Sequence, residues 1–300
     1  MNEQKENFSL LIPMLCGLLV SFLTLLSVIS ESRSNTVPAV AAIAASPTEP
    51  AISAEAYGVW IAGDERPLIG RRTDKPLAPA SLTKIMTSAV AAEKLAPGDT
   101  AVISAYAKGV EERKSAAEQG KVFSRNALLQ MALVMSANDA ALALAERVGG
   151  DGGWLSSPER VAAFVRLMNA KARILGLDAT HFENPTGLDM PRHVASAHDL
   201  ATLAGYVLLR HPELWEMTRA PAAQGTATDG TSNIFENSND LLKEFPGLRG
   251  GKTGRTDRAK DALLLLYPAA PDKTAIIVIL RSDDRFGDGR KLIRWIEEKF

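Results

Sequence analysis

Ser81 and Lys84 are the first residues in this sequence whose types and spacing could support catalysis. They lie in the segment PASLTK, where Pro79 and Ala80 precede Ser81 at the expected start of a helix. Residues three apart on a helix share a face, so the hydroxyl and the amine can touch. A lysine can take a proton from serine only if its pKa is lowered, which a second cation and a dry pocket would do. Taken alone, Ser81 could equally be a helix cap.

Ser136 and Asn138 belong to a second motif, S-A-N, which lies between two apolar stretches in QMALVMSANDAALALAE. Consecutive polar residues there interrupt a core-facing pattern, which indicates a loop between two buried helices with its side chains aimed at a cleft. The alternative interpretation is a simple helix cap at Asn138 or Asp139.

Lys252, Thr253 and Gly254 form a third motif, K-T-G, just before a buried strand. Gly254 would let a substrate backbone lie close to the strand edge, which is typical of peptide recognition. Lys252 would supply the second cation that Lys84 requires. The alternative is a turn with a solvated lysine. The order S-x-x-K, S-x-N, K-T-G carries the specificity, because penicillin-binding proteins and class A β-lactamases combine these motifs.

The elements that must position these motifs follow from hydrophobic periodicity and from Gly and Pro breakers. Strands are expected at both ends of the folded region and helices between them, so the terminal strands should share one antiparallel sheet. We expect a hairpin at 57–61 and 68–70, helices at 81–95, 124–135, 139–148, 157–175 and 196–209, buried strands at 261–267 and 274–280, and a closing helix at 290–299.

The N-terminal region predicts a membrane anchor followed by a linker. Residues 8–30 carry no charge and are long enough to cross a bilayer, whereas a cleavable signal usually has a shorter apolar stretch. We therefore expect a single-pass protein of the cell membrane, with residues 1–7 in the cytoplasm and the catalytic domain outside it. Residues 31–54 are rich in Ala, Ser and Pro, which is typical of a tether.

Composition excludes several classes of function. The 300 residues have a formal net charge of -1 and contain no Lys/Arg-rich block, so nucleic acid is not expected as a partner. The four histidines show no zinc-ligand spacing, and no metal or cofactor is expected. The one cysteine, Cys16, lies in the apolar segment, which excludes a disulfide and cysteine catalysis.

Residues 55–300 resemble the D-alanyl-D-alanine carboxypeptidase family, low-molecular-mass penicillin-binding proteins of the S11 peptidase type. Besides the three motifs, the segments PASLTKIMT, FVRLMNAKARILGLDATHFENPTGLD and SAHDLATLA are similar to that family. The resemblance implies a β-lactamase/transpeptidase-like α+β fold, in which helices flank an antiparallel sheet beside a mostly helical subdomain. It also implies that peptidoglycan stem peptides ending in D-Ala-D-Ala are substrates and that β-lactam antibiotics are covalent inhibitors.

The resemblance assigns roles to the residues of the first two motifs and to Lys252. Ser81 would attack the carbonyl between the two D-alanines and become acylated, and Lys84 would take its proton. Ser136 would relay a proton to the departing D-alanine, and Asn138 would hold the substrate backbone. Lys252 would keep the site positive and orient Ser136.

Further roles concern the substrate carboxylate and the oxyanion. Thr253 is implied to bind the terminal carboxylate, and Arg285 matches a family arginine that helps to hold it. The backbone N–H groups of Ser81 and Arg255 would form the oxyanion hole.

The sequence departs from the family pattern at three places. Lys260 stands where the family usually has glycine, which puts the strand geometry beside the site in question. Ala137 replaces a common glycine in S-x-N. The sequence ends with residues 290–300, so we expect it to lack the C-terminal β-domain and membrane helix of many relatives, with residues 8–30 anchoring it instead.

Three alternatives remain besides carboxypeptidase action. A D,D-endopeptidase would cut beside the same D-alanine in cross-linked peptidoglycan. A class A β-lactamase also needs a deacylating glutamate, and no Glu between Asn138 and Lys252 has Asn four residues later. A non-catalytic penicillin sensor would be acylated without turnover, but the three intact motifs and the short N-terminus argue against it.

Overall fold

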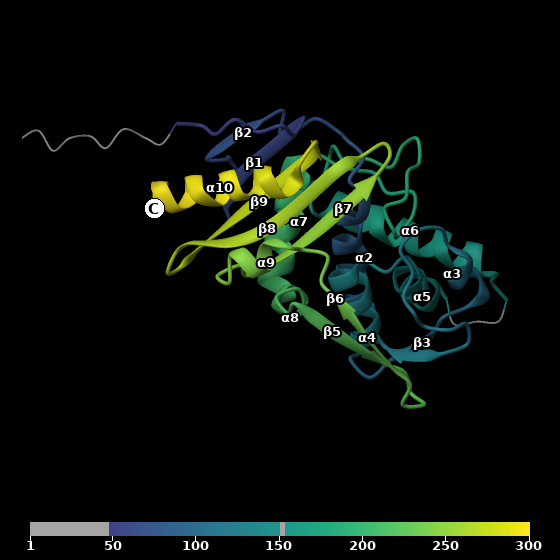
Figure 1. Ribbon diagram of the computed structural model, residues 1–300. Coiled ribbons are helices and arrows are strands. Elements are labelled where there is room, and N and C mark those ends of the chain that lie inside the picture. Colours follow the sequence, from purple (N-terminus) through teal and green to yellow (C-terminus); the bar gives the residue numbers. More distant parts are fainter. Residues whose placement is uncertain (1–47, 151–153) are drawn as a thin grey trace, which may run out of the picture. The chain divides into compact units, whose positions relative to one another are not determined.

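A five-stranded antiparallel sheet brings the two ends of the folded region together. The computed structural model describes residues 48–150 and 154–300. Within them the strand order is β2-β1-β9-β8-β7 (Figure 1). The N-terminal strand pairs with the C-terminal hairpin through the register Tyr57↔Ile279, as the sequence predicted. The strands are β1 (Ala56–Ile61), β2 (Ile69–Arg71), β7 (Gly250–Thr256), β8 (Lys260–Ala270) and β9 (Lys273–Ser282).

Strand alternation divides the sheet into two apolar faces, each covered by helices. Because successive side chains point to opposite faces, Leu264 and Val278 pack with α7 (Ala197–Arg210) in one core. Their neighbours Leu263 and Ile277 pack with α10 (Arg285–Lys299) in the other. Burying both faces explains why β8 and β9 are continuous apolar runs instead of alternating ones. Figure 1 shows α10 running along the sheet.

Helix α2 (Thr83–Lys94) connects the sheet to a mostly helical part of the molecule. Residues 83–91 are all buried, because α2 packs against α5 (Asn138–Gly149), α6 (Ser157–Ile174) and α7. The remaining elements are short: η1 (Ala80–Leu82), β3 (Thr100–Val102), α3 (Ala105–Gly109), β4 (Val122–Ser124), α4 (Arg125–Gln130), η2 (Met131–Met135), α8 (Pro212–Met217), β5 (Ala222–Thr226), β6 (Ser232–Glu236) and α9 (Leu241–Glu244).

Two helix boundaries differ from the sequence prediction for identifiable reasons. The helix expected at 124–135 is an α-helix only as far as Gln130, and a π-helical turn follows it. The closing helix begins at Arg285 instead of residue 290, because the Asp284 carboxylate caps it by accepting a hydrogen bond from the Gly287 N–H. Both differences bear on the site, because the π turn ends at Ser136 and Arg285 opens α10.

The predicted anchor at residues 8–30 lies outside the described residues. Among the helices of residues 48–150 and 154–300, none is both long and apolar enough to span a bilayer. The end of the predicted linker is packed on the fold. Ser53 donates hydrogen bonds to the carboxylate of Asp288 through its backbone N–H and its hydroxyl, and Ile52 and Ala54 are buried.

Candidate active site

Ser81 and Lys84 meet at the junction of η1 and α2. The Nζ atom of Lys84 lies 2.9 Å from Oγ of Ser81. Lys84 is fully buried, and its amine also donates to Oδ1 of Asn138 and to the backbone oxygen of Thr186, at 2.7 Å in both cases. The first two motifs are therefore in direct contact.

The burial of Lys84 has an electrostatic consequence. Loss of hydration lowers its pKa to about 7, and the nearby Arg113 cation acts in the same direction. Near neutral pH a substantial fraction of this amine is therefore unprotonated. A neutral amine within hydrogen-bond distance of a serine hydroxyl can act as its general base.

Ser136 reaches the site because the chain turns sharply there. The π-helical turn η2 ends at Ser136, which adopts a left-handed conformation with φ of 70°. This conformation is uncommon for a residue other than glycine and occurs often at functional sites. The Nζ atom of Lys252 donates to Oγ of Ser136 at 2.9 Å and to the backbone oxygen of Thr253 at 2.9 Å.

Lys252 is as deeply buried as Lys84. Burial lowers its pKa well below the usual value, and the positive charge of Lys84 lowers it further. Because each ammonium disfavours the other, the two amines lose their first proton more readily than an isolated lysine would. Each amine touches a different serine hydroxyl.

Strand β7 lies directly beside Ser81. A Cβ atom on Gly254 would be 2.9 Å from Cβ of Ala80 and 3.0 Å from the backbone nitrogen of Ser81. Only glycine permits so close an approach of the strand to η1. Oγ1 of the adjacent Thr253 shares a hydrogen bond of 2.6 Å with Oγ of Ser238.

Two arginines, Arg255 on β7 and Arg285 at the start of α10, both form ion pairs with Asp261. Nη1 of Arg285 donates to the backbone oxygen of Gly254 at 3.1 Å and to Oδ1 of Asp261 at 2.8 Å. The side chain of Arg255 is 71% exposed and contacts the same carboxylate oxygen at 3.1 Å. Nε of Arg285 is buried and has no hydrogen-bond partner among the described residues.

The backbone conformation of Lys260 explains why the family usually has glycine at this position. Its φ is 55°, in the left-handed region that favours glycine. The strands nevertheless keep their register, with Arg255 opposite Asp261 and Thr256 opposite Lys260. The lysine therefore costs backbone strain without disturbing the strand that borders the site.

The predicted site residues gather around one narrow cleft. Lys84 and Lys252 lie beneath the cleft, and each forms a hydrogen bond to a serine that lines it. The predicted residues that line the cleft are Ser81, Ser136, Asn138, Thr253, Gly254, Arg255 and Arg285.

The cleft has further walls that motif reasoning missed. Thr186 supplies a carbonyl to Lys84, and a Cβ on Gly187, whose φ is 89°, would lie 1.9 Å from the oxygen of Ala80. The Asn-Pro-Thr-Gly turn was the available signal. Glu112 and Arg113, on the loop after α3, also line the cleft, and no local pattern marked them.

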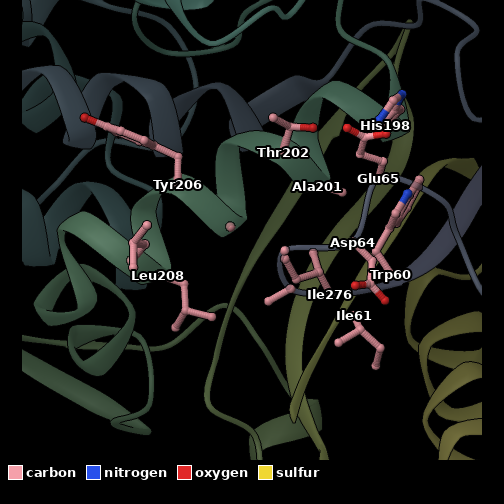
Figure 2. A pocket seen from close by; sticks show the side chains of 14 residues that line it. Trp60, Ile61, Asp64, Glu65, His198, Ala201, Thr202, Tyr206, Leu208 and Ile276 are labelled. Carbon is pink, nitrogen blue, oxygen red and sulfur yellow. The ribbon is translucent and has the colours of Figure 1, made fainter. Parts of the chain in front are cut away.

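A larger cavity of about 480 Å³ lies elsewhere, between α7 and the end of β1 (Figure 2). Its walls include Trp60, Tyr206, Leu209 and Ile276, and none of the predicted site residues lines it. The larger cavity is therefore separate from the cleft that carries the predicted site residues. Among the described residues, no group of three or more His, Cys, Asp or Glu side chains could hold a metal ion.

The fold and the cleft together define a class of protein. The structure superposes on the Streptomyces K15 DD-transpeptidase with a TM-score of 0.75 at 25% sequence identity, covering 83% of this chain and 99% of that one. The described fold is therefore the penicillin-binding, DD-transpeptidase fold, which confirms the predicted fold class.

The family follows from the sequence comparisons. Residues 43–283 match the model of the S11 peptidase family, described as D-alanyl-D-alanine carboxypeptidase. The chain is 36% identical to D-alanyl-D-alanine carboxypeptidase DacF of Bacillus subtilis over 207 residues, which are 65% of this chain and 49% of that one. It is 32% identical to the carboxypeptidase DacB2 of Mycobacterium tuberculosis over 67% of both chains. The chain belongs to the D-alanyl-D-alanine carboxypeptidase family.

These relationships confirm the predicted family and, at the level of the family, the predicted class of serine peptidase. The chain spans about half the length of the Bacillus relative and two thirds of the Mycobacterium one. A D-alanyl-D-alanine endopeptidase of Pseudomonas aeruginosa is also similar, at 29% identity over 77% of this chain and 73% of that one.

Proposed function

We propose that this protein is a serine-type D-Ala-D-Ala carboxypeptidase that trims peptidoglycan stem pentapeptides through an acyl-enzyme on Ser81. The contact between Ser81 and a fully buried lysine with a pKa of about 7 carries this proposal. A solvated lysine would be almost entirely protonated at neutral pH and could not accept the serine proton. The names of the relatives support the same activity.

Acylation is the first half of the proposed reaction. Oγ of Ser81 attacks the carbonyl carbon between the two D-alanines while the neutral amine of Lys84 takes the hydroxyl proton. The backbone N–H groups of Ser81 and Arg255 stabilise the oxyanion of the tetrahedral intermediate. Ser136 relays the proton that Lys84 took to the departing amine, so that Lys84 is neutral again and Ser136 keeps a hydroxyl proton. Lys252 orients Ser136 through the 2.9 Å hydrogen bond. The C–N bond breaks and D-alanine leaves.

Substrate binding uses the remaining polar groups of the cleft. Asn138 holds the backbone of the acyl donor, and β7 at Gly254 borders it as an extended strand. Thr253 and Arg285 bind the terminal carboxylate of the leaving D-alanine. Water then hydrolyses the ester, which restores the hydroxyl of Ser81 and releases the shortened peptide.

The proposal includes a place for the enzyme in the cell. Residues 8–30 anchor it in the cell membrane, residues 31–54 link the anchor to the fold, and residues 55–300 form the peptidase domain outside the cytoplasm. Alkaline extraction of membranes tests this arrangement, because a membrane-spanning anchor retains the full-length protein in the pellet. Release of an intact N-terminus into the supernatant contradicts it.

Two measurements on the purified protein test the activity. Mass spectrometry after treatment with labelled penicillin should find the adduct on the peptide containing Ser81, and Ser81→Ala should abolish it. Incubation with a pentapeptide ending in D-Ala-D-Ala should release free D-alanine. Cleavage of cross-linked muropeptides without release from the pentapeptide would instead establish an endopeptidase, and rapid penicillin turnover would establish a β-lactamase. A label on any other residue would end the assignment of Ser81.

A further inference from the structure

The loop between α3 and β4 is fastened to the start of α5. The backbone N–H of Asn138 donates to the oxygen of Arg113 at 2.8 Å, and its side-chain amide donates to the oxygen of Glu111 at 3.1 Å. The fully buried carboxylate of Asp139 accepts hydrogen bonds from the backbone N–H and the hydroxyl of Ser115. Asn138 and Asp139 therefore set the position of the loop, and Asn138 also contacts Lys84.

Between these attachments the loop presents two opposite charges to the cleft. Glu112 and Arg113 line the cleft, and both are exposed. Neither forms a hydrogen bond or ion pair through its side chain within residues 48–150 and 154–300, and they do not pair with each other. Glu112 has a φ of 56°, which L residues rarely adopt. Strain of this kind is often retained where it orients a functional side chain.

Arg113 lines the cleft that contains Ser81 and Ser136, and its positive charge contributes to lowering the pKa of both Lys84 and Lys252. It lies on a different wall of the cleft from Arg285, whose partners are Asp261 and the oxygen of Gly254. Asn138, which holds the acyl donor in the proposed reaction, belongs to the same wall as Arg113. In the proposed reaction, this pair of charges therefore lies on the side of the cleft where Asn138 holds the acyl donor.

We propose that Glu112 and Arg113 form a subsite for a zwitterionic side chain on the third residue of the stem peptide. This inference rests on the proposed function and names the substrate class of the same site. The third residue directly precedes the D-alanine whose carbonyl is attacked, so its side chain starts about one residue length, roughly 3.5 Å, from the acyl group. An ammonium beside a carboxylate, as in meso-diaminopimelate, satisfies both charges. A lysine side chain leaves Arg113 without its anion.

Steady-state kinetics with two pentapeptides tests the subsite. The peptides carry meso-diaminopimelate or L-lysine at the third position and are otherwise identical. The wild type should show a kcat/KM about 10-fold higher for the diaminopimelate peptide, since one charge-assisted contact differs. Arg113→Gln should slow acylation by both peptides to the same extent through its effect on Lys84, and it should remove the preference by raising KM for the diaminopimelate peptide in addition. Arg113→Lys should restore part of the preference. Glu112→Gln should lower kcat/KM for both peptides, because both carry the ammonium group that Glu112 would bind. Lys114→Gln, which changes a neighbouring exposed cation outside the cleft lining, is the control.

Penicillin acylation separates recognition from a general electrostatic effect, because penicillin has no third-residue side chain. The change in the rate of penicillin acylation in Arg113→Gln measures how far Arg113 affects the pKa of the two lysines. The kcat/KM values for the two peptides are divided by this change before they are compared. Equal kcat/KM for both peptides in the wild type, or an equal loss for both in Arg113→Gln, overturns the subsite while the carboxypeptidase assignment stands. Absence of D-alanine release from either peptide overturns the proposed function and the subsite with it.

Discussion

The rate of Ser81 acylation should follow the ionisation of Lys84. With a pKa of about 7, this amine is about 9% neutral at pH 6 and about 91% neutral at pH 8. If the neutral amine is the base, the second-order rate constant for acylation should rise about tenfold between these values and level off above pH 8. A base with the usual lysine pKa would still be gaining rate at pH 9.

Stopped-flow measurements with a fluorescent penicillin between pH 5.5 and 9 provide the assay. The Arg113 cation lowers the pKa of Lys84, so Arg113→Gln should move the midpoint to higher pH and slow acylation at pH 7. The plateau at high pH should stay nearly unchanged, because the amine is neutral there in both proteins. A rate that is flat or falls from pH 6 to 8 in the wild type would refute the reasoning.

Three substitutions test other parts of the structure. Lys84→Arg should abolish penicillin labelling while circular dichroism remains native, since a guanidinium does not deprotonate; retained labelling contradicts the base role. Gly187→Ala should cost about 2–3 kcal/mol in denaturant unfolding and slow acylation, because its Cβ would lie 1.9 Å from the oxygen of Ala80. Gly63→Ala, with similar φ but open space, should cost less, and equal losses would exclude the clash. Lys260→Gly should raise Tm by about 2 °C by relieving its left-handed φ, and a lower Tm would show no strain there.

The parts of the fold that sequence patterns predicted share one property. These elements are long enough for burial to leave a clear pattern of apolar residues in the sequence. Examples are the strands that contain Leu264 and Val278 and the helix that begins at Ser157. The hairpin β5–β6 and the strands β3 and β4 were missed, because elements of three to five residues carry too weak a signal.

Boundaries were least predictable where tertiary contacts compete with local preference. The stretch around Met131 has the composition of an α-helix, but it finishes as a π turn that delivers Ser136 to Lys252. Such a turn is unfavourable in isolation and depends on the packing and hydrogen bonds around it. Lys260 similarly holds a glycine-like φ while the register between β7 and β8 stays regular.

The sequence by itself determined which chemical groups this protein has and in what order, because the three motifs contain two serine hydroxyls, two lysine amines and a glycine at a strand edge. Only the tertiary structure decided that Lys84 and Lys252 are fully buried beneath one cleft. A pKa depends on hydration and on charges distant in sequence, such as Arg113 acting on Lys84. No local pattern records those distances, because they arise where β7 packs against η1 and where α2 packs against α5.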